Sequence, residues 1–126
     1  MAKILTYKGK TLEELKNMSL TEFAEFTNAR ARRSLKRGLT DGQKILLKKL
    51  KTAKKPLKTH CRDLVIIPEM LGKEILIHNG KEWTPIEIGV ELLGKRLGEF
   101  ALTRKKISHS APGIGATKSS KHLSVR

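Results

Sequence analysis

Cysteine and aromatic residues are scarce in this chain. Cys61 is the only cysteine, so no internal disulfide can form, which is typical of a protein in a reducing cytosol. The aromatic residues are limited to three Phe, one Trp and one Tyr. A protein that stacks nucleic-acid bases on aromatic platforms usually carries more. This scarcity therefore predicts recognition of phosphates and shape rather than of bases.

Long apolar runs are also missing. The longest ones, such as residues 64–67, are far too short to cross a bilayer. The first ten residues contain no long apolar stretch, so we expect no secretory signal. His and Cys residues show neither CxxC nor paired-ligand spacing, so we expect no metal site and no metal cofactor. No nucleophile and base are arranged as in an active site, and we expect neither an enzyme nor a small-molecule substrate.

Acidic residues are absent after Glu99, whereas basic residues are abundant. The net charge is +15 and the isoelectric point about 10.3. Residues 28–62 hold thirteen Lys and Arg against one acid, and residues 100–126 hold six against none. Such a field predicts association with a polyanion. Nucleic acid is favoured over an anionic membrane, because the basic stretch 48–58 lacks the bulky aromatics of membrane-surface helices.

Helix-start signals are concentrated in the N-terminal half. Three pairs match the capping box: Thr11 with Glu14, Ser19 with Glu22, and Thr40 with Gln43. The helix that begins after Ser19 is predicted to run to about Leu35, with Gly38 as its stop signal. The helix that begins after Thr40 is predicted to close before Pro56.

The centre of the chain favours strands. The β-rich run 62–67 is stopped by Pro68, and residues 73–78 and 81–86 flank Asn79-Gly80. An Asn-Gly pair there predicts a hairpin in which both turn residues take positive φ. Pro85 lacks an N–H group and predicts an edge strand. Two further expectations are a short helix within residues 90–97 and a core that includes Leu64, Ile66, Ile75 and Trp83.

Four segments resemble the small-subunit ribosomal protein nineteen family. They are residues 59–72, Asn79-Gly80-Lys81, residues 94–100 and residues 109–120. Residues 31–39, Ala-Arg-Arg-Ser-Leu-Lys-Arg-Gly-Leu, resemble its archaeal and eukaryotic branch, called ribosomal protein fifteen of the small subunit in eukaryotes. Many relatives carry His where Lys95 stands, so no role of that His is carried over.

The resemblance implies an α+β domain with a small three-stranded sheet in the head of the small ribosomal subunit. It also implies binding to small-subunit ribosomal RNA, pairing with small-subunit protein thirteen, and a C-terminal tail that reaches toward the tRNA sites. The expected location is the cytoplasm, in the ribosome. The alternative is a free-standing basic RNA chaperone, which the charge alone would support.

We expect a basic helical N-terminal extension in residues 1–58, a folded core in 59–102, and a flexible basic Gly/Ser-rich tail in 103–126. The candidate RNA-binding residues share positive charge or a backbone that can approach RNA closely. They are Arg30, Arg32, Arg33, Arg37, Lys54, Lys55, Lys58, Arg62, Lys81, Arg104, Lys105, Lys106, His109, Gly113, Gly115, Lys118 and Lys121.

Overall fold

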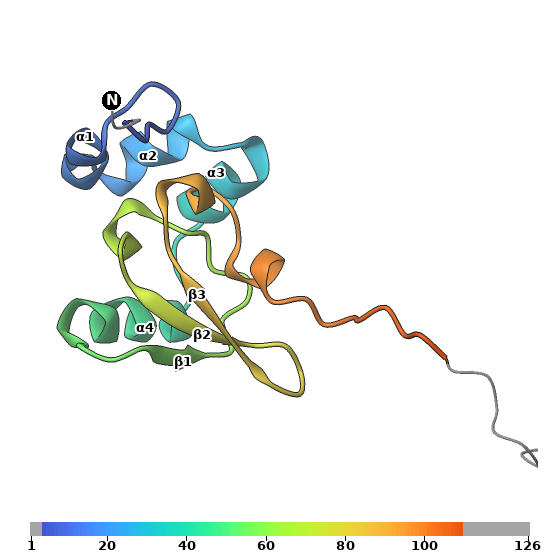
Figure 1. Cartoon of the computed structure of the whole chain (residues 1–126). Helices are drawn as coiled ribbons and strands as arrows, with labels where there is room; N and C mark the ends of the chain where they lie inside the picture. The colour runs from blue at the N-terminus through green and yellow to red at the C-terminus, as the bar shows by residue number, and fades with distance from the viewer. Residues whose placement is uncertain (1–3, 110–126) are drawn as a thin grey trace, which may run out of the picture.

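The structure is a computed structural model that describes residues 4–109. Four helices precede a small sheet (Figure 1). The elements are α1 (Leu12–Asn17), α2 (Leu20–Phe26), α3 (Ala29–Lys36), α4 (Asp41–Thr52), β1 (Leu57–Thr59), β2 (Glu74–His78) and β3 (Trp83–Glu87), with 3-10 turns η1 (Pro68–Met70), η2 (Val90–Leu92) and η3 (Leu97–Phe100). The predicted α+β class with a three-stranded sheet is confirmed.

All three capping boxes form as the sequence predicts. Thr11, Ser19 and Thr40 each accept a backbone hydrogen bond at the start of α1, α2 and α4. The single helix predicted from Ser19 to Leu35 is wrong, because the chain breaks after Phe26. Asn28 takes an extended conformation there, and its side chain accepts the Ala31 N–H at 2.9 Å to start α3.

The sheet has the order β1-β2-β3, with β1 parallel to β2 and β2 antiparallel to β3. Leu57 is opposite Ile75 in the first pair, and Leu76 is opposite Pro85 in the second. Pro85 therefore lies on an edge strand, as predicted. The strand predicted at residues 62–67 is wrong, since that run forms only an isolated bridge between Val65 and Arg96. Its apolar side chains are buried by packing rather than by pairing in the sheet.

The hairpin between β2 and β3 is confirmed, but its turn differs from the predicted one. Gly80 has a φ of +100°, whereas Asn79 does not take a positive φ. The Asn79 side-chain oxygen instead accepts the N–H groups of Lys81 and Glu82 at 3.0 and 2.7 Å. The loop therefore spans residues 79–82 and is held by an asparagine side chain, a common way to build a turn.

The core lies between the sheet and the helices. Leu64, Ile66 and Ile75 are fully buried, as predicted. The expectation for Trp83 is wrong, because this side chain is only partly buried on the outer side of the sheet. The helix predicted in residues 90–97 is replaced by η2 and the first residue of η3, since Gly94 takes a φ of +76° between them.

The N-terminal extension and the core share one hydrophobic cluster, to which Leu15, Phe23 and Leu35 contribute from the helices. Strand β1 lies across the boundary predicted at residues 58 and 59. The division into extension, core and tail stays a prediction. After η3 the described chain forms neither helix nor strand up to His109 and runs away from the body (Figure 1). Within residues 4–109, no helix is long and apolar enough to cross a membrane.

Candidate RNA interface

Helix α3 presents a row of arginines on one face. Arg30, Arg33 and Arg37 follow one another at intervals of three and four residues, which places them side by side on the helix and its C-cap. All three side chains are exposed. The positive φ of Gly38 then ends the helix and turns the chain away.

A fourth arginine from the core completes a basic hollow. Arg30, Arg33, Ser34, Arg37 and Arg96 line an open hollow of ≈ 320 Å³, called the arginine hollow below. The Arg96 guanidinium donates to Ser34 Oγ at 2.6 Å and to the Asp63 carbonyl at 2.8 Å. These bonds fix Arg96 between α3 and the core.

Arg96 is absent from the candidates predicted by sequence. It belongs to the segment Gly94-Lys95-Arg96, in which the sequence shows two basic residues. Its position beside Ser34 arises from a contact between residues 62 positions apart. No local pattern reports such a contact, so only the structure brings Arg96 to this site.

No carboxylate lines the arginine hollow. The Glu99 carboxylate accepts the backbone N–H of Arg96 at 3.4 Å but forms no ion pair with a guanidinium in the described residues. In residues 4–109 the ion pairs are Lys51 with Glu69, at 3.2 Å, and Lys105 with Glu82, at 3.7 Å, and both are exposed. Four guanidinium groups that lack an ion-pair partner within residues 4–109 favour the binding of an anion. Guanidinium forks match phosphate oxygens in geometry as well as charge.

Two of the predicted RNA-binding arginines, Arg32 and Arg62, donate hydrogen bonds to carbonyls within the protein. Arg32 donates from its guanidinium to the carbonyls of Ala24, Glu25 and Thr27, each at 3.2 Å. These carbonyls are at the C-terminal end of α2, where unpaired carbonyls favour a cation. The guanidinium of Arg32 therefore caps α2 and anchors α3 to it.

Arg62 has a comparable internal position. Its guanidinium donates to the carbonyls of His78, Gly98 and Ala101 at 2.7, 2.8 and 2.6 Å. These three contacts join the end of β2 to η3 and to the point where the tail leaves. The structure therefore favours a structural role for Arg62.

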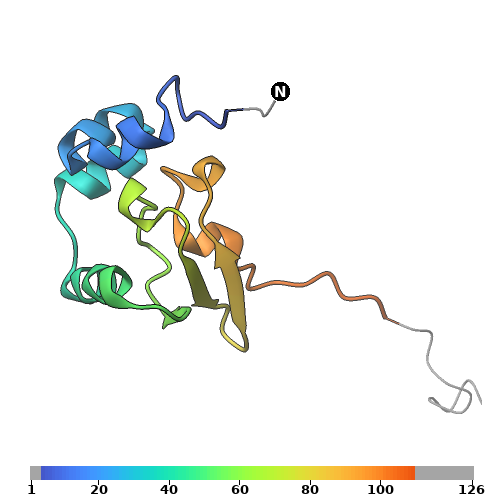
Figure 2. The ribbon, with the colours of Figure 1, turned by 60° about the vertical axis from the view of Figure 1, so that its left-hand side comes forward.

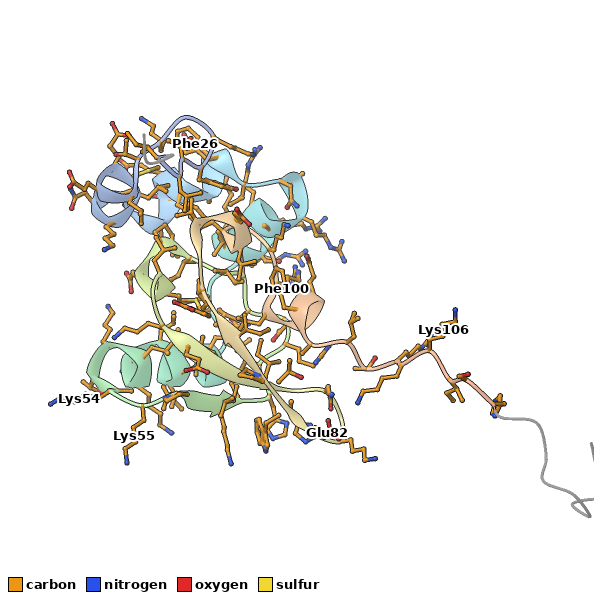
Figure 3. All side chains as sticks on the ribbon, in the orientation of Figure 1. Phe26, Lys54, Lys55, Glu82, Phe100 and Lys106 are labelled. Carbon is orange, nitrogen blue, oxygen red and sulfur yellow. The ribbon has the colours of Figure 1, made fainter. Side chains whose placement is uncertain are left out.

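The predicted lysines lie at the other end of the molecule. Lys54 and Lys55 lie between α4 and β1, and both project outward there (Figure 3). Lys58 in β1 and Lys81 in the hairpin loop are exposed as well. The arginine hollow and these lysines are therefore two separate basic regions.

The described part of the tail adds a third basic region. Arg104, Lys105 and Lys106 are exposed outside the core, as predicted, and Lys106 points away from the body (Figure 3). His109 is exposed as well. Lys105 reaches back to Glu82 in the hairpin loop. The candidates Gly113, Gly115, Lys118 and Lys121 lie outside the described residues.

This arrangement defines a class of protein: a small α+β domain that exposes arginines and lysines and whose described residues group no set of three metal ligands. Such a surface is that of a nucleic-acid-binding protein. The chain belongs to the ribosomal protein S19 family, whose family model matches residues 33–109. Members of this family are structural components of the small ribosomal subunit that bind ribosomal RNA and take part in translation, and they are not enzymes. The match includes Arg33, Arg37 and Arg96 of the arginine hollow and begins after Arg30.

Proposed function

We propose that this protein occupies the head of the small subunit as a member of the archaeal and eukaryotic branch of its family. The observation that carries the proposal is the arginine hollow, in which four arginines meet without a carboxylate. Bound RNA would supply the missing negative charge. The protein would thereby stabilise a place where RNA segments converge, since closely spaced phosphates repel one another unless cations separate them.

Each of the three basic regions then contacts a different part of the RNA. The arginine hollow holds phosphates against α3 and the core. Lys54, Lys55 and Lys58 contact a neighbouring stretch of backbone. The tail from Arg104 onward extends beyond the folded domain toward the tRNA sites. This division is supported by exposure, because the side chains of all these lysines and of Arg104 face solvent in the described structure.

Pairing with small-subunit protein thirteen and a cytoplasmic location complete the proposal. Both follow from the family resemblance of residues 59–72 and 94–100 rather than from any contact in the structure. A binding titration between the two purified proteins, with and without RNA of the subunit head, tests the pairing. An association that needs neither protein's folded core would contradict it.

The phosphate-binding role of the arginine hollow is tested by a charge substitution with a matched control. Arg33→Gln removes one guanidinium from the hollow, whereas Lys16→Gln removes one charge from α1. RNA affinity is measured over a range of salt concentrations. We expect Arg33→Gln to weaken binding and to reduce the slope of log affinity against log salt by about one. If both substitutions change RNA affinity and its salt slope equally, the hollow contributes only through the net charge of the protein.

A further inference from the structure

Three aromatic rings come together at the hairpin end of the sheet. Trp83 begins β3 directly opposite His78 at the end of β2, and His60 follows β1. The ring centroid of Trp83 lies 4.8 Å from that of His78 and 5.0 Å from that of His60. The centroids of the two His rings are 4.7 Å apart. Trp83 is the only tryptophan of the chain, and it is not part of the hydrophobic core.

This aromatic cluster lies on the side of the sheet that faces away from the core. Side chains alternate between the two sides of a strand, and Ile75 and Ile77 are buried on the inner side. The outer side carries Lys58 and Pro85, both exposed, next to the partly buried Leu76. Figure 2 shows α4 and the loops of the core on the inner side of the sheet. His60 is itself exposed, so the cluster is accessible from solvent.

Positive charge surrounds the aromatic cluster. The Lys58 ammonium lies over the Trp83 ring, 5.4 Å from its centroid. Lys81 is exposed in the adjoining loop. Glu82 in the same loop is also exposed and pairs with Lys105 at 3.7 Å, whereas Glu74 and Glu87 are opposite each other at the far end of the two strands. The outer side is therefore aromatic and mainly basic at one end and acidic at the other.

Hydrogen bonding adds a directed donor to this end. The Nδ1 atom of His78 accepts the N–H of Gly80 at 3.0 Å, so the neutral ring carries its proton on Nε2. An indole ring, two imidazoles and an ammonium group form a combination that suits a nucleobase and its phosphate. Bases stack on aromatic rings, and single-stranded RNA is recognised in this way on open sheet faces.

We propose that Trp83, His60 and His78 form a stacking platform for one unpaired RNA base, with Lys58 holding the adjoining phosphate. The proposal rests on the proposed function, because it requires RNA to bind this protein, and it adds base contact to phosphate contact. It also departs from the expectation that scarce aromatics leave bases unrecognised. That expectation considered Phe, Trp and Tyr and left the two histidines out.

Tryptophan fluorescence of the full chain tests the stacking directly, because Trp83 is the only emitter of its kind. The probes are a short single-stranded oligoadenylate and an abasic ribose-phosphate oligomer of the same length and charge. We expect the oligoadenylate to quench Trp83 emission and the abasic oligomer to bind with little quenching. Equal quenching by both probes, or binding of oligoadenylate without quenching, overturns the stacking platform.

Substitutions separate the platform from the phosphate contacts. Trp83→Leu removes the stacking ring and should weaken oligoadenylate binding about 5- to 150-fold, whereas Trp83→Phe should retain most of the affinity. The slope of log affinity against log salt should stay the same in both variants, because stacking releases no counterions. Thermal melting confirms that each variant is folded.

The outcomes distinguish failure of the platform from failure of the proposed function. If the wild type shows no salt-dependent RNA affinity, the proposed function fails and the platform fails with it. If the wild type binds RNA with a steep salt slope while folded Trp83→Leu binds equally well, the platform alone is overturned. Loss of binding to protein thirteen in Trp83→Leu, with RNA affinity intact, would assign the cluster to a protein contact instead.

Discussion

The hydroxyl oxygen of Tyr7 lies 2.7 Å from the position that a Cβ atom would take on Gly94. Gly94 has a φ of +76°, a conformation that side chains other than glycine's rarely adopt. Tyr7 also packs near Phe23, with ring centroids 6.0 Å apart, and burial raises the pKa of its phenol. Because Gly94 has no side chain, Tyr7 of the N-terminal extension can pack against the surface of the core at this point.

Replacing this glycine should loosen the joint between the extension and the core. Gly94→Ala is expected to lower the free energy of unfolding by at least about 1–2 kcal/mol, because the left-handed backbone and the Tyr7 hydroxyl both oppose a Cβ atom. Gly89→Ala is the matched control, since Gly89 has a φ of −97° and no atom within 4 Å of its Cβ position. Urea denaturation measures both. An equal decrease in the free energy of unfolding for both variants would show that the packing of Tyr7 against Gly94 does not stabilise the fold.

Arg62 gives a prediction that separates folding from RNA binding. Each hydrogen bond from its guanidinium to a carbonyl contributes about 1.5–3 kcal/mol. A lysine cannot reproduce the planar fork, so Arg62→Lys is expected to lose at least one of the three bonds. Chemical denaturation should show the loss, whereas exposed Arg33→Lys should melt like the wild type.

A variant that removes the charge is informative about RNA. Because the Arg62 guanidinium is engaged with three carbonyls, folded Arg62→Gln should keep the salt slope of RNA binding. A smaller slope of log affinity against log salt, with unchanged stability, would show that Arg62 contacts phosphate.

Local signals predicted the helix starts but not every break. Capping boxes need only residues three positions apart, and all three formed as predicted. Asn28 is also a capping residue, but the apolar residues on both sides of it continue a helical pattern, which hid the break. Strand β1 has only three residues and carries little sequence signal. The apolar run at residues 64–67 has a stronger strand signal than β1, although it forms only an isolated bridge.

The candidate site was predictable as a composition and not as a geometry. Basic side chains in the sequence indicate which residues carry charge. Arg30, Arg33 and Arg37 are exposed, and their contact with RNA stays a prediction. The internal contacts of Arg32 and Arg62 depend on carbonyls that only the folded chain brings within reach. The apolar ring of Trp83 suggests a core position, but its place opposite His78 in the strand pair puts it on the outer side.

RNA affinity should depend steeply on salt. If about six phosphates are neutralised, log affinity should fall with log salt at a slope of roughly −4 to −5. A filter-binding titration with RNA of the subunit head measures the slope, and a slope near zero would remove the phosphate-contact proposal. Co-sedimentation with small subunits after a high-salt wash complements it, because a free-standing RNA chaperone would be washed away.

The last prediction separates the folded core from the tail that extends beyond it. Ile66 is fully buried, so Ile66→Ala is expected to cost about 2–5 kcal/mol, a large share of the stability of a small domain. The variant should melt at a lower temperature than the wild type and enter subunits poorly.

Arg104, Lys105 and Lys106 are exposed beyond η3, and changing all three to Ala removes only the surface ion pair with Glu82 from the folded part. This triple variant should melt like the wild type, enter subunits, bind RNA more weakly and impair tRNA handling. Thermal melting and subunit incorporation, measured for both variants, decide the matter. A triple variant as unstable as Ile66→Ala would make the start of the tail part of the fold.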